Sequence, residues 1–364
     1  MRHFNSSALP RIMACQGSVA LSEAAPKPEK TDDAKEGTAF HHFAALLLTG
    51  QSVALGDNAP NGHILDAEML EHARDYAATL KAAPDWTQRV ESPLHWGPGG
   101  VAHDGQPWQV RVKCDAVTWR PDISTLAVTD GKYGFRFVDA VDNWQLLSQA
   151  IGACFALQIQ PQQIILAIYQ PRGPGETLRT HTITAQELLV AYGELCDRLS
   201  NLTNELVTGP QCRHCPAAAG CPATERAAYN AVDVAMNSGA FAVREETMAS
   251  ELALLDRAAE LLKQRKTWIE GAALAAMKDG RQIPGLQSKP VLGHTAWLPN
   301  TSGKLRELQS DNQRFFDEVP VTPAEAKRRG MTAEDLKALT HRPLRGHKLI
   351  STAAGAKDAA KVFK

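Results

Sequence analysis

The sequence predicts a mixed α/β fold, in which helices flank a central β-sheet and a mainly helical region follows. Residues 107–119 alternate apolar and polar side chains, as a half-buried strand does. The nearly all-apolar run at 162–170 is typical of a central strand buried on both faces. Helical patterns before, between and after these strands supply the covering layers. The alternation in 107–119 assigns one face to Trp108, Val110, Val112, Cys114 and Ala116, and the other to Gln109, Arg111, Lys113 and Asp115.

Caps, breakers and periodicity place the other elements of the first part of the chain. The first 30 residues are expected to be irregular, apart from a short helix around PRIMACQGSVAL. The segment SPLHWGPGG begins a β-rich section. The segment RPD turns the chain between the strand at 107–119 and a second strand. A capping-box pattern formed by Thr184 and Glu187 marks the start of a further helix. Helices are expected at 36–50, 64–83 and 143–157, and a strand at 123–130.

The character of the sequence changes near residue 230, so we predict one domain over 1–229 and an accessory region over 230–364. Residues 246–278 form one long helical pattern, with apolar pairs repeating every seven residues. A strand pattern in KPVLGHTAW and a helical hairpin around TPAEAKRRGMTAEDLKAL follow. Residues 322–364 hold ten lysines and arginines against four acids. Such an end suits contact with phosphates, although a basic, partly solvated end is the commoner explanation.

Composition bounds the function only loosely. The net charge of −1 gives no global indication of a nucleic-acid partner. No run approaches the ~20 apolar residues that a membrane-spanning helix needs. The N-terminal segment lacks the continuous apolar stretch of a secretory signal, so a cytoplasmic location is expected.

Two acids and a lysine are predicted to meet where two strands end. Asp115 interrupts a strand between two buried-looking neighbours, and Asp130 ends the next strand, two residues before Lys132. A hairpin through Arg120–Asp122 would bring the carboxylates together. Carboxylates suit Mg²⁺ or Mn²⁺, and a lysine can orient water or stabilise an anion. The sequence TDGK is also an ordinary turn composition, which is the structural alternative.

Three of the seven cysteines are clustered in the segment CRHCPAAAGC. Cys212, Cys215 and Cys221 have a spacing that favours metal binding over free thiols. Cys15 is the best placed fourth ligand, while Cys114, Cys154, Cys196 and His214 are the alternatives. The spacing alone leaves a [4Fe–4S] cluster and a structural Zn²⁺ both open.

Taken together in chain order, these motifs resemble the PD-(D/E)XK nucleases. The resemblance is to the RecB- and Cas4-like iron–sulfur branch, and more closely to phage-encoded exonucleases of the DUF2800 type. Its G-T-x-x-H motif matches residues 37–41, its aspartate motif matches Asp115, and its (D/E)-x-K motif matches residues 130–132. The Q-x-x-x-Y motif matches at Gln145, but Gln149 replaces the tyrosine, which weakens the DNA-contact role inferred there. The cysteines Cys15, Cys212, Cys215 and Cys221 match the iron–sulfur ligands.

The resemblance implies a restriction-endonuclease-like core and assigns roles to these residues. It makes Lys132 the residue that positions the water, and Gln145 one that orients this lysine or the DNA backbone. The cluster would close the fold around the DNA path. The metal ligands are expected to be His41, Asp115, Asp130 and the carbonyl of Gly131. Without the resemblance, a histidine such as His41 on an amphipathic helix is more often structural.

The leading hypothesis is therefore a Mg²⁺- or Mn²⁺-dependent DNA exonuclease in phage or prophage replication or recombination. It would act on DNA ends in the host cytoplasm, with a phage single-strand-binding or recombination protein as a further partner. A DNA-binding scaffold that has kept the fold without cleavage is the alternative, motivated by Gln149 and the basic C-terminal region. A zinc-stabilised structural protein is a third hypothesis.

Overall fold

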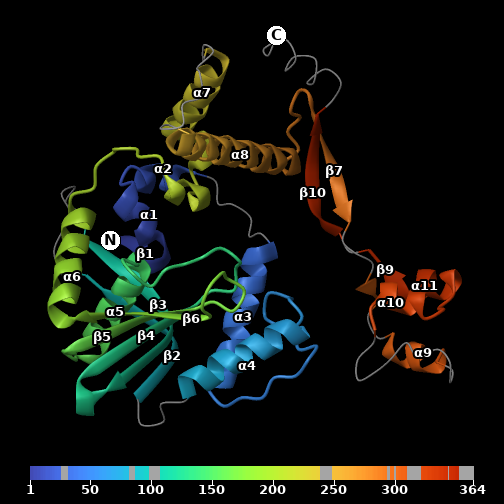
Figure 1. The fold of residues 1–364 in the computed structure, drawn as a ribbon, viewed down its shortest axis with the longest axis horizontal. Helices are drawn as coiled ribbons and strands as arrows, with labels where there is room; N and C mark the ends of the chain where they lie inside the picture. Colours follow the sequence, from blue (N-terminus) through green and yellow to red (C-terminus); the bar gives the residue numbers. More distant parts are fainter. Residues whose placement is uncertain are drawn as a thin grey trace. The chain divides into compact units, whose positions relative to one another are not determined.

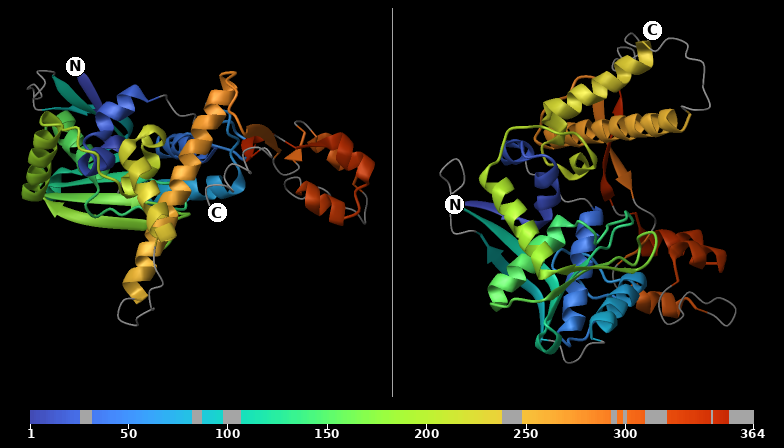
Figure 2. Two further views of the ribbon diagram at one scale, coloured as in Figure 1. Left: turned by 90° about the horizontal axis from the view of Figure 1, so that it is seen from above. Right: turned by 60° about the vertical axis from the view of Figure 1, so that its left-hand side comes forward.

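A computed structural model describes residues 1–25, 32–81, 87–97, 107–237, 248–292, 296–298, 301–309, 321–342 and 344–351. The chain forms two compact units, Met1–Glu245 and Glu246–Lys364. The division falls after the boundary expected near residue 230, because helix α7 (Pro222–Asn237) runs through that position. Figures 1 and 2 show the elements of both units.

The first unit contains a six-stranded mixed sheet with the order β1-β3-β4-β5-β6, and β2 pairs with β3. β1 runs parallel to β3 and β4 parallel to β5, whereas the β2–β3, β3–β4 and β5–β6 pairs are antiparallel. The strands are β1 (Arg2–Asn5), β2 (Thr87–Trp96), β3 (Trp108–Arg120), β4 (Thr125–Gly131), β5 (Gln163–Tyr169) and β6 (Leu178–Thr184).

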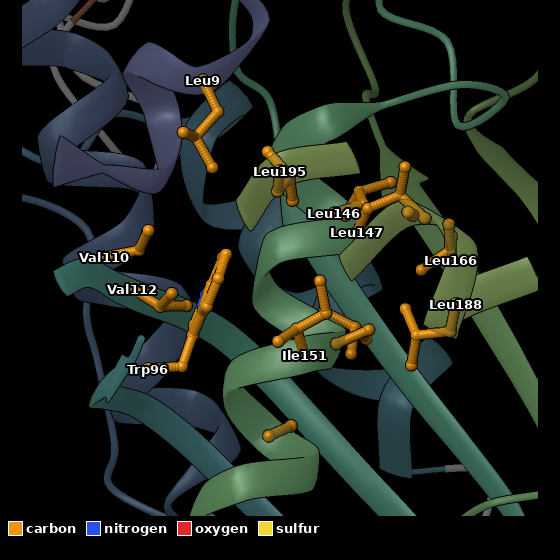
Figure 3. Close-up of a cluster of buried hydrophobic side chains, with 14 of the residues drawn as sticks. Leu9, Trp96, Val110, Val112, Leu146, Leu147, Ile151, Leu166, Leu188 and Leu195 are labelled. Atoms are coloured by element: carbon orange, nitrogen blue, oxygen red, sulfur yellow. The ribbon is translucent and has the colours of Figure 1, made fainter. Parts of the chain in front are cut away.

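Helices cover both faces of this sheet, each over its own hydrophobic core (Figure 1). Helices α1, α5 and α6 pack on one face, and Figure 3 shows the leucine-, isoleucine- and valine-rich core beneath them. Helices α3 and α4 pack over the other face, where the core is rich in aromatic and alanine side chains. The helices are α1 (Leu9–Ala14), α2 (Ser18–Ala24), α3 (Asp32–Leu48), α4 (Ala67–Lys81), α5 (Trp144–Leu157) and α6 (Ala185–Ser200).

Local sequence signals explain where α5 and α6 begin. The Asn143 side chain accepts hydrogen bonds from the backbone N–H groups of Gln145 and Leu146, which caps α5. Thr184 and Glu187 form the expected capping box at the start of α6. The Asn143 cap fixes the first turn of α5 beside the end of β4.

The predicted strands and helices of the central region are confirmed, but two strands differ from expectation. Residues 2–5 form β1 instead of an irregular segment, because β3 offers them a free edge for parallel pairing. Residues 178–184 form β6, whose polar side chains gave little apolar alternation. The predicted facing of Ala116 is wrong: it packs in the core under α3, while Cys114 and Val117 pack in the core under α5. The alternation along β3 therefore breaks at Asp115.

The same position interrupts the pairing along one edge of β3. β1 pairs with residues 108–111 of β3, and β4 pairs with residues 116–120. Both lie on the edge opposite β2, because β2 pairs with β3 along both stretches. Among the residues that the structure describes, 112–115 therefore have no strand partner on this edge, and side chains supply the missing contacts there.

The second unit consists of one long helix, two small sheets and short helices. Helix α8 (Met248–Lys278) confirms the predicted long helix. β7 (Leu286–Leu292) pairs with β10 (Leu344–Ser351), and β8 (Ala296–Trp297) pairs with β9 (Thr340–His341). The short helices are α9 (Ser302–Glu307), α10 (Pro323–Arg328) and α11 (Ala333–Leu339), the last two forming the predicted hairpin.

Two further observations bear on the expectations for this unit. Arg328 and Arg329 both pair with Glu325, so part of the basic excess is balanced locally. The alanine- and lysine-rich end after Ser351 lies outside the described residues. Nowhere in the described part of the chain is there a helix with both the length and the apolar character needed to cross a membrane.

Candidate active site

The predicted carboxylates meet at the point where β3 and β4 separate. The two strands pair as a hairpin through the short 3-10 turn Pro121–Ile123, with Ala116 opposite Thr129. Asp115 and Asp130 are the next residues beyond this last pair, so they lie side by side at the end of the ladder. Both are buried, with 9% and 3% of their surface exposed. Burial of two acids this close requires partners for both.

Asp115 is held from the α3 side of the sheet. Its Oδ2 lies 3.0 Å from Nδ1 of His41 on α3 and accepts a 2.7 Å hydrogen bond from the backbone N–H of Gly131. Burial alone would raise the pKa of Asp115, but the charge and hydrogen bond of His41 and the Gly131 N–H outweigh it and lower this pKa. Burial likewise opposes the charged form of His41, but Asp115 prevails and raises the pKa of His41. His41 and Asp115 therefore each stabilise the charged form of the other.

Asp130 is held from the α5 side of the sheet. Its Oδ1 accepts hydrogen bonds from Nε2 of Gln145 (2.7 Å) and Nε2 of Gln149 (3.0 Å). Its Oδ2 lies 2.6 Å from Nζ of Lys132, which also donates a 3.0 Å hydrogen bond to Oε1 of Gln145. Burial disfavours the charged form of Lys132, but Asp130 outweighs it and raises the pKa of Lys132. Lys132 is therefore a fixed cation at neutral pH.

Gln149 has a different role from the one that the sequence suggests. Its side chain is completely buried, so it is not placed to touch DNA. It holds Asp130, and its Nε2 also donates a 3.0 Å hydrogen bond to the carbonyl of Lys113. This carbonyl belongs to the stretch of β3 that has no described strand partner on the edge opposite β2. Because Gln145 and Gln149 are one helical turn apart on α5, both amides reach the same carboxylate oxygen.

Glu91 is a site residue that sequence reasoning missed. One ligand atom from each of His41, Glu91 and Asp115 lies within 4.8 Å of the others. The β2–β3 pairs on either side, Val90 with Ala116 and Ser92 with Cys114, place Glu91 across from Asp115. Glu91 has a left-handed backbone, with φ of 50°. A non-glycine residue in this conformation is uncommon and tends to occur at functional sites. The signal in the sequence was weak: one acid in the strand-like run RVESPLHW.

These residues line one end of a cavity of about 1040 Å³. The cavity contains all of His41, Asp115, Asp130, Lys132 and Gln145 in its lining, together with Glu91. Its size is at or just above that of pockets for small ligands, typically ~300–1,000 Å³. It therefore has room for a substrate larger than one small molecule.

Gly131 lies where a side chain would be crowded. A Cβ at this position would be 3.1 Å from Cε1 of Phe40 and 3.7 Å from Oδ2 of Asp115. Phe40 is fully buried and stacks on Tyr133, with ring centroids 4.6 Å apart. Phe40 and Tyr133 therefore form an aromatic layer beside Gly131, and it is this layer that an added side chain would crowd. The role predicted for the Gly131 carbonyl stays a prediction.

The structure brings the four predicted cysteines to a second location. Cys15, Cys212, Cys215 and Cys221 line one small cavity, and the backbone N–H of Val207 donates to Sγ of Cys15 at 3.4 Å. Burial raises the pKa of Cys212, and the neighbouring thiols add to the rise. Among the described residues these thiols do not form a set of three within 4.8 Å; His41, Glu91 and Asp115 do.

The alternative ligands lie elsewhere. Cys114 is in the core beneath α5, and Cys154 and Cys196 pack against that core. His214 is exposed and is not part of the lining of the cysteine cavity. Glu36 on α3 pairs with Arg172 at 2.9 Å.

The fold and site together define a mixed α/β protein with a histidine–carboxylate donor set beside a buried aspartate–lysine pair. The chain belongs to the family described as "Protein of unknown function (DUF2800)", whose model matches residues 3–314. No curated protein matches the chain at a significant level. The chain is also similar to the protein in a solved structure titled "Crystal structure of SSO0001", with 12% sequence identity and a TM-score of 0.29. That similarity covers 61% of this chain and 86% of the other, and at this TM-score it carries no argument.

Proposed function

We propose that this protein is a metal-dependent deoxyribonuclease with a restriction-endonuclease-like PD-(D/E)XK core that hydrolyses phosphodiester bonds at DNA ends. One observation carries the proposal: Asp115, Asp130 and Lys132 gather beside His41 in a cavity of about 1040 Å³. Acids with a lysine at the end of paired strands form the D-x(n)-D-x-K signature of the nucleases that the sequence resembles. The RecB- and Cas4-like assignment rests on that resemblance.

The donor set fits a hard divalent cation such as Mg²⁺ or Mn²⁺. His41, Glu91 and Asp115 offer one nitrogen and two carboxylate oxygens within 4.8 Å of one another. Asp130 lines the same cavity and is the further carboxylate that the sequence predicts as a ligand. Held there, the cation would supply Lewis-acid stabilisation of charge on the phosphate.

Lys132 provides the second part of the chemistry. Asp130 and Gln145 fix its ammonium group, and its raised pKa keeps it protonated. It therefore acts as a hydrogen-bond donor that orients the attacking water and stabilises the developing negative charge, and not as a general base. Gln145 and Gln149 hold the carboxylate that holds the lysine, so they are positioning residues.

The cysteine cavity supports the proposal of a [4Fe–4S] cluster. All four predicted ligands line it, and they join the N-terminal segment to residues 212–221. The resemblance in sequence favours a cluster over a single zinc ion. The cluster would be structural.

The biological setting that we propose is phage or prophage DNA replication or recombination, in the host cytoplasm. DNA is the proposed substrate, and a phage single-strand-binding or recombination protein is a further proposed partner. These two elements rest on the resemblance in sequence alone.

The test is digestion of end-labelled linear and circular DNA, in single- and double-stranded form, by protein purified anaerobically. With Mg²⁺ or Mn²⁺ the wild type should degrade linear DNA and spare circles, and EDTA should stop it. Lys132→Ala should be inactive, while Lys263→Ala, a change at an exposed lysine on α8, should not matter. Absence of any cleavage by the wild type, with DNA still retained, would favour the non-cleaving scaffold. Iron content and a brown colour with absorption near ~400 nm would separate a cluster from colourless zinc.

A further inference from the structure

We infer that Arg111 and Lys113 bind two successive phosphate groups of the DNA strand, next to the phosphate that reacts at Asp115. This inference rests on the proposed function and names the part of the substrate that the cavity engages beyond the reacting bond. The ligand is a sugar–phosphate backbone with at least two phosphates on one side of the reaction centre.

The first argument is that the three residues share one face of β3. Arg111, Lys113 and Asp115 are alternate residues of the strand, and all three line the cavity. The residues between them, Val112 and Cys114, belong to the hydrophobic core beneath α5. The side chains of Arg111 and Lys113 are exposed, with 67% of the Lys113 side chain accessible.

The second argument is the spacing along the strand. Alternate residues of a strand are separated by about 6.6 Å, since each residue rises ~3.3 Å. Successive phosphorus atoms in DNA are six covalent bonds apart, which gives a similar separation when the backbone is extended. A strand whose reacting phosphate lies at Asp115 would therefore place its next phosphate at Lys113 and the following one at Arg111.

The third argument is the composition of the cavity wall around Arg111 and Lys113. In the strand register, β2 places Glu91, Pro93 and His95 opposite Asp115, Lys113 and Arg111. β1 places Asn5 beside Arg111, and Asn5, Ser6 and Ser7 complete this end of the cavity. Acidic groups are thus confined to the end with the metal donors. The other end, around Arg111, offers cationic, amide and hydroxyl groups. Such groups are those that proteins use to contact phosphates.

Lys113 links the two ends of the cavity. It pairs with Glu91, which belongs to the proposed donor set. Its long flexible stem lets the ammonium group lie between Glu91 and a bound phosphate. Arg111 has no acidic partner among the described residues that line the cavity, so its guanidinium is available for a bidentate phosphate contact.

The test compares Arg111→Gln, Lys113→Gln and the double variant with the wild type. The control is Arg74→Gln/Arg226→Gln, which removes the same charge from exposed positions on α4 and α7 outside the cavity. In EDTA, the dependence of log K on log salt for a labelled single-stranded oligonucleotide should weaken by about 0.7 for each residue removed. In Mg²⁺ or Mn²⁺, each change should raise KM for long substrates about threefold to tenfold, with kcat nearly unchanged. A dinucleoside monophosphate, which has only the reacting phosphate, should be cleaved equally by the wild type, Arg111→Gln and the control.

The outcomes separate the inference from the proposed function. If the wild type cleaves DNA but the salt dependence and KM of the double variant equal those of the control, the inference is wrong and the proposed function stands. If the variants lose as much rate on the dinucleoside monophosphate as on long DNA, they act on the reaction centre, and the inferred phosphate contacts of Arg111 and Lys113 are refuted. If the wild type cleaves nothing, the proposed function fails, and the salt dependence still decides whether these two residues contact phosphates.

Discussion

Replacing Gln149 with leucine tests whether this residue joins the site to the sheet. Gln149 is completely buried on α5, and its Nε2 bonds both to Asp130 and to the carbonyl of Lys113. Leucine has a similar volume, so the change removes the hydrogen bonds without leaving a large void. We expect a loss of both stability and activity.

The magnitude follows from the partners that remain. The Lys113 carbonyl would lose this partner on the edge of β3 that β1 and β4 leave unpaired, at a cost of about 1–3 kcal/mol. Asp130 would keep Gln145 and Lys132, so its loss is about 1 kcal/mol. The Oε1 of Gln149 is buried without a partner, and its removal offsets about 1 kcal/mol. The net change in the free energy of unfolding is about 1–3 kcal/mol, or roughly 3–10 °C in Tm for a domain of this size.

Thermal unfolding followed by circular dichroism measures this change on the full chain, and digestion of labelled DNA measures the activity. The control is Gln186→Leu, at an exposed position in the first turn of α6. Gln145→Leu is the comparison within the site: it should reduce activity strongly with a smaller change in Tm, because Gln145 bonds to no backbone carbonyl in β3. If the Tm of Gln149→Leu lies within 1–2 °C of the wild-type Tm, the reasoning is refuted, because the expected loss of free energy should lower Tm by more than this in a domain of this size.

The remaining predictions concern four other positions. Lys132→Ala should reduce cleavage by at least about 100-fold in a digestion assay, because a fixed donor to the developing charge is lost. Gly131→Ala should destabilise the protein by about 1–3 kcal/mol in urea unfolding, because the added methyl lies 3.1 Å from Phe40. Cys212→Ser should abolish the absorption near ~400 nm and lower Tm in the same preparation. For Glu187→Ala, the hydrogen bonds from Thr184 lower the pKa of the native carboxyl. The wild type should therefore be the more stable protein above pH 4.5, and unfolding curves at lower pH should show this advantage disappearing as the carboxylate is protonated.

The sequence predicted the central elements because their signals are local. Alternation identified β3, apolar continuity identified β5, and a capping box located the start of α6. β1 and β6 were missed because their side chains carry little alternation, and their pairing depends on edges that only the assembled sheet provides.

The candidate site was predicted in part for the same reason. Asp115, Asp130 and Lys132 stand out because charges interrupt or end apolar strands, and the hairpin between β3 and β4 brings them together. Glu91 gave no comparable signal, since its place opposite Asp115 depends on the β2–β3 register. Gln149 was interpreted as a lost tyrosine, because the gap in pairing that it fills cannot be seen in one strand's sequence.

The break in pairing along β3 also explains how the site's residues divide between structure and chemistry. Between β1 and β4, side chains replace strand partners: Gln149 binds the Lys113 carbonyl, and Asp115 accepts the Gly131 N–H. Substituting either residue leaves a buried backbone group without a partner, so stability and activity should fall together. Lys132 bonds only to side chains through its ammonium group, so its substitution can remove the chemistry while the sheet stays intact. Variants that lose activity alone should therefore identify the groups that act on the substrate. Variants that lose both activity and stability should identify the groups that bind the unpaired backbone between β1 and β4.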